Sequence, residues 1–246
     1  MTVKVTFVGS GDAFGAGGRF QTCILVNAPG FCFTIDFGAS SLVALNKLGI
    51  DHNTIDAIVM THFHGDHYGG IPFMLMDAML GAKRQRPLTI MGPRETKQRL
   101  AGLTEALLPG MHVMKPKFPI DYVEMDVMRP NRIGDLTVTL YPAHHTGETN
   151  PTSVRAEIAG KVVSYTGDSA WTKHMPEVAR DADLFVCECY FYEKPIRFHL
   201  NYPDIKAHWH ELKAKRIVLT HFSREMMRFK DTVPEECAYD GLEITL

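Results

Sequence analysis

A cluster of metal-binding residue types between Thr61 and Gly70 constrains this chain more than any other feature. The stretch reads THFHGDHYGG, so three histidines and one aspartate fall within six positions, directly after the apolar run Ala57–Met60. Neutral imidazole and carboxylate groups are the ligands that zinc and neighbouring divalent metals take in proteins. His62 and His64 are two positions apart and point to the same side of an extended backbone. Asp66 and His67 lie past the turn and can face a second ion, which predicts a metalloenzyme.

The whole chain, residues 1–246, is expected to form a single domain. Hydrophobic residues make up 45% of it and charged residues 22%, as in ordinary globular proteins. Strand and helix patterns follow one another without repeats or long linkers, which predicts two sheets covered by helices. Strands are expected at 3–8, 22–26, 31–35, 57–60, 88–91, 136–141, 153–158, 162–165, 184–187 and 216–220, and helices at 40–48, 71–82, 95–108 and 203–212.

Charge, hydropathy and cysteine content exclude several classes of protein. The net charge of −2 argues against a strongly basic nucleic-acid-binding protein, and no apolar run reaches the length of a membrane span. The N-terminus reads as a strand and not as a signal peptide. Five cysteines at irregular spacing favour free thiols over a disulfide framework, so we expect a cytoplasmic protein.

Further acidic and imidazole side chains stand at the ends of other predicted strands. They are His144, His145, Asp168, Glu188 and His221. Functional side chains commonly gather on the loops at one edge of a sheet. Six or seven such ligands are enough for two metal ions held about 3.5–4 Å apart.

Taken together, these motifs resemble the metallo-β-lactamase superfamily, whose His-x-His-x-Asp-His signature falls on His62, His64, Asp66 and His67. Within it, the chain is most similar to the tRNase Z-like branch of phosphodiesterases. The matches run from one end of the chain to the other, at residues 7–13, 166–169 and 219–223. The resemblance implies an α/β fold with four layers, the αββα sandwich.

The resemblance also implies a ligand set for two divalent ions. The first ion takes His62, His64 and a third histidine, and the second takes Asp66, His67 and His221, with Asp168 bridging the two. His144 and His145 are alternatives for the third histidine. We expect His145, because the family pattern places an arginine ten residues after this ligand and Arg155 occupies that place. Zinc is the expected metal, and manganese and iron are alternatives.

A proton donor follows from a further match. The tRNase Z-like branch has a His-Glu-Ala-Thr motif whose glutamate orients a later histidine. Here Glu188 matches the glutamate, Cys187 replaces the preceding histidine, and His199 is the later histidine. We expect Glu188 to orient His199, which protonates the leaving group. A polar strand end for Glu188 and a loop histidine without a catalytic contact for His199 are the alternatives.

The implied function is a dinuclear hydrolase, with phosphodiesters as the expected substrates. A hydroxide bridging the two ions attacks, and Asp66 orients it. The alternatives are hydrolysis of lactones, thioesters or other carboxylic esters, and a non-catalytic metal-binding module. We also expect Phe63 and Tyr68 to border the substrate mouth.

One departure from tRNase Z limits the substrate. The arm by which that enzyme grips tRNA lies between the third histidine and the Gly-Asp motif, where this chain has only 23 positions (168 − 145). Stable tRNA binding is therefore not expected, and a small ester is the expected substrate. The oligomeric state stays open, with a homodimer as one alternative.

Overall fold

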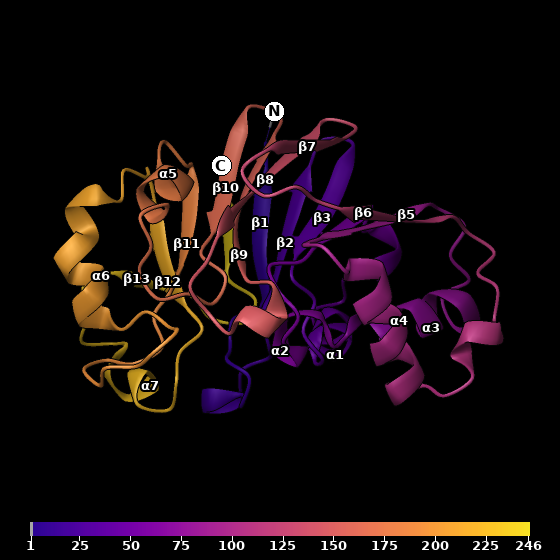
Figure 1. The fold of residues 1–246 in the computed structure, drawn as a ribbon, viewed down its shortest axis with the longest axis horizontal. Helices are drawn as coiled ribbons and strands as arrows, with labels where there is room; N and C mark the ends of the chain where they lie inside the picture. The colour runs from indigo at the N-terminus through magenta and orange to yellow at the C-terminus, as the bar shows by residue number, and fades with distance from the viewer. Residues whose placement is uncertain (1) are drawn as a thin grey trace.

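A computed structural model describes residues 2–246, apart from the side chain of His112, and shows two sheets of seven strands each (Figure 1). The N-terminal sheet has the order β14-β1-β2-β3-β4-β5-β6 and the C-terminal sheet the order β13-β12-β11-β10-β9-β8-β7. The first consists of β1 (Lys4–Gly9), β2 (Cys23–Ala28), β3 (Phe31–Ile35), β4 (Ala57–Val59), β5 (Leu88–Gly92), β6 (Ile120–Glu124) and β14 (Glu243–Thr245). The second consists of β7 (Pro130–Ile133), β8 (Leu136–Pro142), β9 (Thr152–Ile158), β10 (Lys161–Tyr165), β11 (Leu184–Glu188), β12 (Ile217–Thr220) and β13 (Glu236–Cys237).

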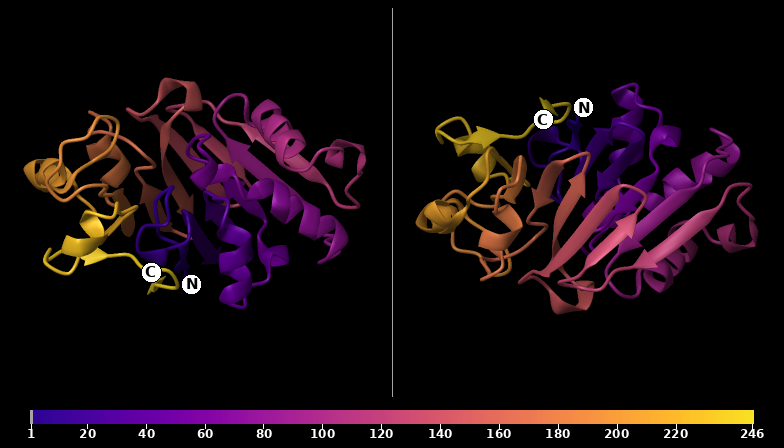
Figure 2. Two further views of the ribbon diagram at one scale, coloured as in Figure 1. Left: turned by 90° about the horizontal axis from the view of Figure 1, so that it is seen from below. Right: turned by 90° about the horizontal axis from the view of Figure 1, so that it is seen from above.

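Both faces of the sheets are buried, because apolar side chains alternate between two cores along the strands. In β2, Ile24 and Val26 point into the core between the sheets, whereas Cys23 and Leu25 pack beneath helices. The outer face of the N-terminal sheet is covered by α1 (Ser41–Lys47), α3 (Ile71–Leu80) and α4 (Thr96–Leu107). On the other side lie α5 (Met175–Ala179), α6 (Tyr202–His208) and α7 (Met226–Phe229) (Figure 2). The predicted αββα sandwich is confirmed.

Local sequence signals account for where the helices begin. In α3, Pro72 occupies the first turn, where a missing backbone N–H leaves no hydrogen bond unmade. In α6, the Asn201 side chain accepts a hydrogen bond from the backbone N–H of Asp204 at 2.8 Å. The predicted helix 203–212 is shorter in the structure, because the α-helix gives way at His208 to a 3-10 turn, Trp209–Glu211. None of the described helices is long and apolar enough to cross a lipid bilayer.

The carboxyl ends of parallel strands create the edge on which the candidate site is built. Strands β3 to β6 are parallel to one another, and so are β10 to β13. Parallel strands that are neighbours end at the same edge of a sheet, and ligand sites form there. The segments that follow β3, β4, β10 and β12 carry Asp36, residues 61–68, Asp168 and His221. The one-turn helix α2 (Gly65–Tyr68) holds Asp66 and His67 in this edge.

Candidate metal centre

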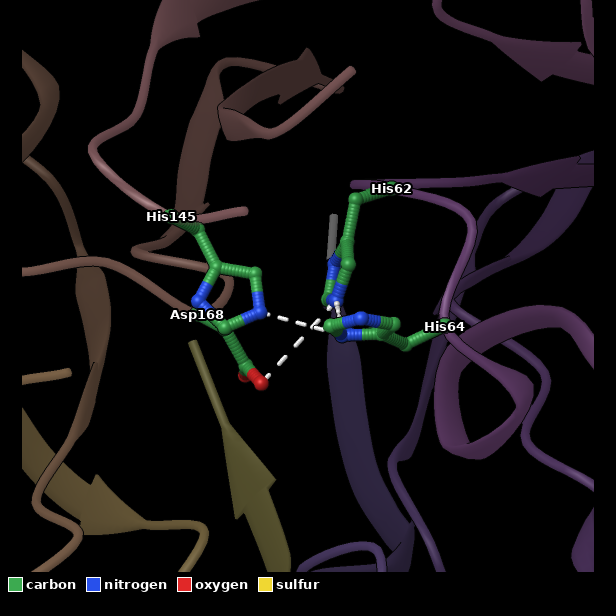
Figure 3. Close-up of side chains that lie close together, drawn as sticks. All are labelled: His62, His64, His145 and Asp168. Carbon is green, nitrogen blue, oxygen red and sulfur yellow. Dashed lines mark hydrogen bonds and ion pairs between the residues drawn. The ribbon is translucent and has the colours of Figure 1, made fainter. Parts of the chain in front are cut away.

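Three histidines and one aspartate from both halves of the chain converge at this edge, and we call them the His62 cluster (Figure 3). His64 Nδ1 lies 3.2 Å from His62 Nε2 and 3.0 Å from His145 Nε2. Asp168 Oδ2 lies 3.9 Å from His62 Nε2. His145 thus lies in this cluster, whereas the ring of the neighbouring His144 lies against Phe198. The members of the His62 cluster are His62, His64, His145 and Asp168.

A second group shares Asp168 with the first, and we call it the His67 cluster. Its members are Asp66, His67, Asp168 and His221. His67 Nε2 lies 3.3 Å from Asp66 Oδ2 and 3.2 Å from Asp168 Oδ1. His221 Nε2 lies 3.3 Å from Asp66 Oδ2 and 3.5 Å from Asp168 Oδ1. Asp168 thus presents one carboxylate oxygen to each cluster.

The donor atoms of these clusters are suited to cations. His67 Nε2 and Asp168 Oδ1 are buried and have no hydrogen-bond partner among the described residues. Buried polar atoms are normally paired, so an unpaired nitrogen beside an unpaired carboxylate oxygen calls for a ligand that accepts lone pairs from both. A divalent cation is such a ligand, and the mixture of imidazole and carboxylate donors fits zinc, manganese or iron.

Hydrogen bonds fix three of the rings with their Nε2 lone pairs toward the centre. His145 Nδ1 donates to the carbonyl oxygen of Phe198 at 2.9 Å, and this oxygen can only accept. His67 Nδ1 donates to Asp36 Oδ2 at 2.7 Å. Thr61 Oγ1 donates to Asp36 at 2.8 Å and so accepts from His62 Nδ1 at 3.0 Å. Such partners set the tautomer and orientation of histidines that bind metals.

The three histidines of the His62 cluster are neutral at neutral pH. Burial lowers the pKa of His62 well below its ordinary value, and the charge on His67 lowers it further. Burial also lowers the pKa of His64 and of His145. Neutral imidazole is the form that binds a metal ion.

The His67 cluster favours positive charge. Burial alone lowers the pKa of His67, but the carboxylates of Asp168 and Asp66 outweigh it and raise this pKa well above its ordinary value. The pKa of His221 is raised in the same way, against burial, by Asp168 and by its hydrogen bond to Asp66. Without an ion, the carboxylates of Asp66 and Asp168 hold a proton on each of these two rings, and a cation bound there would take the place of these protons.

Glu188 and His199 form a pair next to both clusters. Glu188 is fully buried, and its Oε1 accepts a short hydrogen bond from His199 Nδ1, while its Oε2 accepts one from Ser169 N at 3.0 Å. Oε1 also lies 3.4 Å from His221 Nδ1. Burial opposes a charge on His199, yet the charge of Glu188 and its hydrogen bond raise the pKa of His199. The predicted contact between these two side chains is present.

Asp36 and Thr61 are two functional candidates that sequence reasoning missed. Asp36 is fully buried and accepts hydrogen bonds from the backbone N–H of Thr61, the hydroxyl of Thr61 and the ring of His67. Its φ of 61° is rare for a residue with a side chain, and His221 has a φ of 60°. An aspartate after a short strand gives no sequence signal of such a role.

The cavity over the metal centre has a volume of about 270 Å³ and contains members of both clusters. Ala13, Phe14, Tyr190 and His199 line it as well. The expectation for Phe63 and Tyr68 is wrong. Their rings lie 5.5 Å apart and are buried in the apolar core beneath the helices, because both side chains are turned away from the metal ligands between them in sequence.

The sequence of this chain is similar to those of known proteins over most of its length. Residues 3–237 match the family described as Anti-Pycsar protein Apyc1. A ribonuclease Z of Agathobacter rectalis is 25% identical over 287 residues, with 95% of this chain and 92% of the relative aligned.

Solved structures share the fold over the full length of the chain. YhfI from Bacillus subtilis, a metallo-β-lactamase fold protein, matches with a TM-score of 0.80 and 21% identity over 100% of this chain and 99% of YhfI. A diphosphatase of the PhnP family matches with a TM-score of 0.80 and 20% identity over 100% of this chain and 98% of that structure. The sandwich described above is therefore the metallo-β-lactamase fold.

Proposed function

This chain belongs to the family of the Anti-Pycsar protein Apyc1, and from that premise we propose that it hydrolyses phosphodiesters at a dinuclear metal centre formed by the His62 cluster and the His67 cluster. It is a metal-dependent hydrolase of the tRNase Z-like branch of the metallo-β-lactamase superfamily. One observation carries the proposal. Asp168 presents Oδ2 to His62 Nε2 at 3.9 Å and Oδ1 to His67 Nε2 at 3.2 Å, as a carboxylate shared by two ions does.

We assign the ligands as the sequence resemblance implies. His62, His64 and His145 hold one ion, Asp66, His67 and His221 hold the other, and Asp168 is shared. We propose zinc as the physiological metal. Two bound divalent ions supply a water molecule of lowered pKa and stabilise negative charge on the phosphate oxygens.

The residues around this centre have separate roles in the reaction. We assign Asp66 the role of orienting the attacking water, because it lines the cavity over the metal centre. Attack forms a bond from the water oxygen to phosphorus, and the bond from phosphorus to the leaving oxygen breaks. His199 donates its proton to that oxygen, and the proton lost by the attacking water passes to solvent, from which His199 is protonated again, so the products are a phosphomonoester and an alcohol. Glu188 holds the Nδ1 side of His199, which leaves Nε2 to donate.

The same pair separates phosphodiesters from the rival substrates. An alkoxide that leaves from phosphorus needs a proton from a general acid. Hydrolysis of a lactone or thioester depends less on such an acid. The raised pKa of His199 and its contact with Glu188 therefore favour phosphodiesters. The segment between His145 and Asp168 holds the hairpin β9–β10 and the 3-10 turn Gly147–Thr149, with no inserted arm, which supports a small ester as the substrate. All five cysteines are free, which supports a cytoplasmic location.

A screen of metal-replete protein tests the proposal directly. We expect hydrolysis of bis-p-nitrophenyl phosphate or of cyclic nucleotides, no comparable hydrolysis of lactones, and two equivalents of metal by elemental analysis. Asp66→Ala should abolish turnover in a folded protein, and the exposed Asp121→Ala is the control. Near-normal turnover by metal-replete Asp66→Ala protein would refute the role of Asp66, and a preference for lactones would refute the proposed chemistry.

The acid role of His199 has its own test. His199→Ala should slow hydrolysis of esters with alkyl leaving groups far more than that of p-nitrophenyl esters, because p-nitrophenolate leaves without a proton. The matched control is the exposed His210→Ala. Equal losses of hydrolysis rate on both kinds of ester would count against the role of His199 as a general acid.

A further inference from the structure

A separate cavity lies between α3, α4 and β6. It has a volume of about 220 Å³, and none of the described residues that line it also lines the cavity over the metal centre. Its walls are formed where α4 packs against α3, against β6 and against the 3-10 turn Met111–Val113 (Figure 1). The cavity is therefore distinct from the site of the proposed reaction.

The walls of this cavity are apolar and adaptable. Leucine, isoleucine and proline side chains form part of the lining, and three methionines, Met79, Met111 and Met114, form another part. Unbranched methionine side chains can change rotamer to fit ligands of different shape. The Thr104 hydroxyl donates to the carbonyl oxygen of Leu100 at 2.7 Å, so it has no proton left to donate into the cavity. The interior is therefore suited to a hydrocarbon group.

One end of the cavity carries a cation. Leu100, Ala101 and Thr104 on α4 line the cavity. Lys97 precedes them on the same face of this helix, at the spacing of one turn. Its Nζ atom lies 5.8 Å from the centre of the Tyr122 ring, which also lines the cavity. The Lys97 ammonium therefore stands at the Tyr122 end.

The polar groups at this end lack an acceptor. The Lys97 ammonium has no hydrogen bond or ion pair with any residue that the structure describes, and the Tyr122 hydroxyl has no hydrogen bond with one. The nearby Glu124 carboxylate accepts from the backbone N–H of Lys97 at 3.4 Å and not from its ammonium. Burial raises the pKa of Tyr122, so its hydroxyl keeps its proton. An ammonium and a hydroxyl that both donate are suited to a carboxylate.

We propose that this cavity binds a free medium-chain fatty acid, with the alkyl chain inside the cavity and the carboxylate at Lys97 and Tyr122. A neutral hydrocarbon would leave both donors unpaired, whereas a carboxylate accepts from both. The volume sets the length of the chain, because an apolar cavity of about 150 Å³ holds benzene and one of about 220 Å³ therefore holds about eight carbons. Octanoate is the matching probe. The inference does not depend on the proposed function, since it uses no group at the metal centre.

Calorimetry with octanoate on the full chain tests the cavity. The parent protein should bind octanoate, and Ala101→Trp should weaken binding about tenfold or more, because an indole would occupy the space of the alkyl chain. Ala101 is exposed, so the variant should fold, and its melting temperature checks this. Ala106→Trp, at an exposed position of α4 outside the cavity, is the matched control and should bind as the parent does. Absence of octanoate binding by the parent, or equal binding by Ala101→Trp, overturns the proposal.

The role of the cation has a separate test. Lys97→Gln should weaken octanoate binding about tenfold, because a hydrogen bond to a charged group corresponds to roughly that factor. Octan-1-ol has the same chain without the charge, and its affinity should be equal in Lys97→Gln and the parent. The exposed Lys173→Gln is the control. Octanoate affinity that is the same in Lys97→Gln and the parent overturns the carboxylate site.

Phosphatidylglycerol vesicles distinguish a free fatty acid from the acyl chain of a membrane lipid. When the vesicles are floated on a density gradient, the protein should stay behind in solution, which supports a free fatty acid. Flotation of the parent protein with the vesicles, lost in Ala101→Trp, overturns the free fatty acid as the ligand.

Discussion

Asp36 belongs to neither cluster, but its carboxylate is hydrogen-bonded, directly or through Thr61, to one histidine of each. Its Oδ2 accepts from His67 in one cluster, and through Thr61 it orients His62 in the other. Burial raises the pKa of Asp36, and the hydrogen bonds from His67 and Thr61 act against this rise. The residue is therefore a positioning residue for one histidine of each proposed metal ion.

Asp36→Asn should weaken metal binding without removing any ligand. The side-chain amide of asparagine can turn its NH2 group, a donor, toward His67 Nδ1. His67 then carries its proton on Nε2, the nitrogen that faces the centre and would otherwise bind the metal. We expect affinity for zinc to fall about 10- to 100-fold, measured by competition with a chelator. Asp56→Asn is the control, because Asp56 directly precedes β4, at the end away from the metal centre, and forms an ion pair with Arg86. Unchanged zinc affinity with a lowered melting temperature would mean that Asp36 is only structural.

The turn after β3 packs closely against the metal-binding segment. A Cβ atom on Gly38 would lie 2.2 Å from the backbone oxygen of Asp66 and 2.7 Å from the Cβ atom of Gln21. Distances this short are not found in real structures, so one of the two segments must shift. Glycine at this position lets the end of β3 approach α2 and keeps Asp66 in place.

Gly38→Ala should lower the free energy of unfolding by about 1–3 kcal/mol, as overpacking in a closed site does. The control is Gly102→Ala in α4, where an added Cβ meets nothing within 4 Å. That change should raise the free energy by about 0.5–1 kcal/mol, because alanine is the better helix former. Urea unfolding measures both changes in the free energy of unfolding. A Gly38→Ala protein as stable as the parent would contradict the close contact between Gly38 and Asp66.

Asp183, just before β11, joins three parts of the C-terminal sheet. Its carboxylate accepts from the backbone N–H of Val162 at 2.9 Å and from the Lys215 ammonium at 2.9 Å, and Lys161 lies 3.5 Å away. Burial raises the pKa of Asp183, but the hydrogen bonds from Lys215 and Val162 and the charge of Lys161 outweigh it, and the pKa is lowered. These contacts therefore stabilise the fold only while the carboxylate is ionised.

The contribution of Asp183 should consequently depend on pH in a definite direction. A lowered pKa in the folded state gives stability that is present above the unfolded value of about 3.9 and is lost as the pH falls through the folded value. We expect Asp183→Asn to be less stable than the parent at pH 7 and the difference to shrink below about pH 4. Urea unfolding from pH 7 to 3 measures it, with the exposed Asp135→Asn as control. A difference that grows in acid would show the opposite sign.

For the whole molecule, the proposed ions act as cross-links between distant parts of the chain. Asp66 and His221 are 155 positions apart, and His64 and His145 are 81 positions apart. The first member of each pair follows β4 of the N-terminal sheet, and the second belongs to the C-terminal half of the chain. Without a cation, the buried carboxylates of Asp66 and Asp168 face each other across the His67 cluster.

Removing the metal should therefore destabilise the whole fold. A ligand present at 100 times its Kd adds about 2.7 kcal/mol to the free energy of unfolding, so a chelator should lower the melting temperature by several degrees. Calorimetry with and without EDTA, followed by zinc addition, measures the shift and its reversal. His64→Ala should show a smaller shift than His210→Ala. Equal melting temperatures with and without zinc would exclude a stabilising ion.

Much of the architecture could be predicted because it depends on local periodicity. Central strands such as β4 and β11 are continuous apolar runs, and Pro72 and Asn201 give clear helix starts. None of the four edge strands β6, β7, β13 and β14 was predicted. β6 is only partly buried on either face, and β7 begins with Pro130, so neither has the apolar alternation by which strands are recognised.

The residue types and order of the candidate site were likewise available from sequence, because His62, His64, Asp66 and His67 are close neighbours whose chemistry needs no fold to be recognised. The tertiary structure decided which of His144 and His145 turns inward, through a hydrogen bond to Phe198 that is 53 positions away. It also decided that Asp36 supports both clusters. Side-chain direction at a turn is set by such distant contacts, and these exist only once the two sheets have packed together.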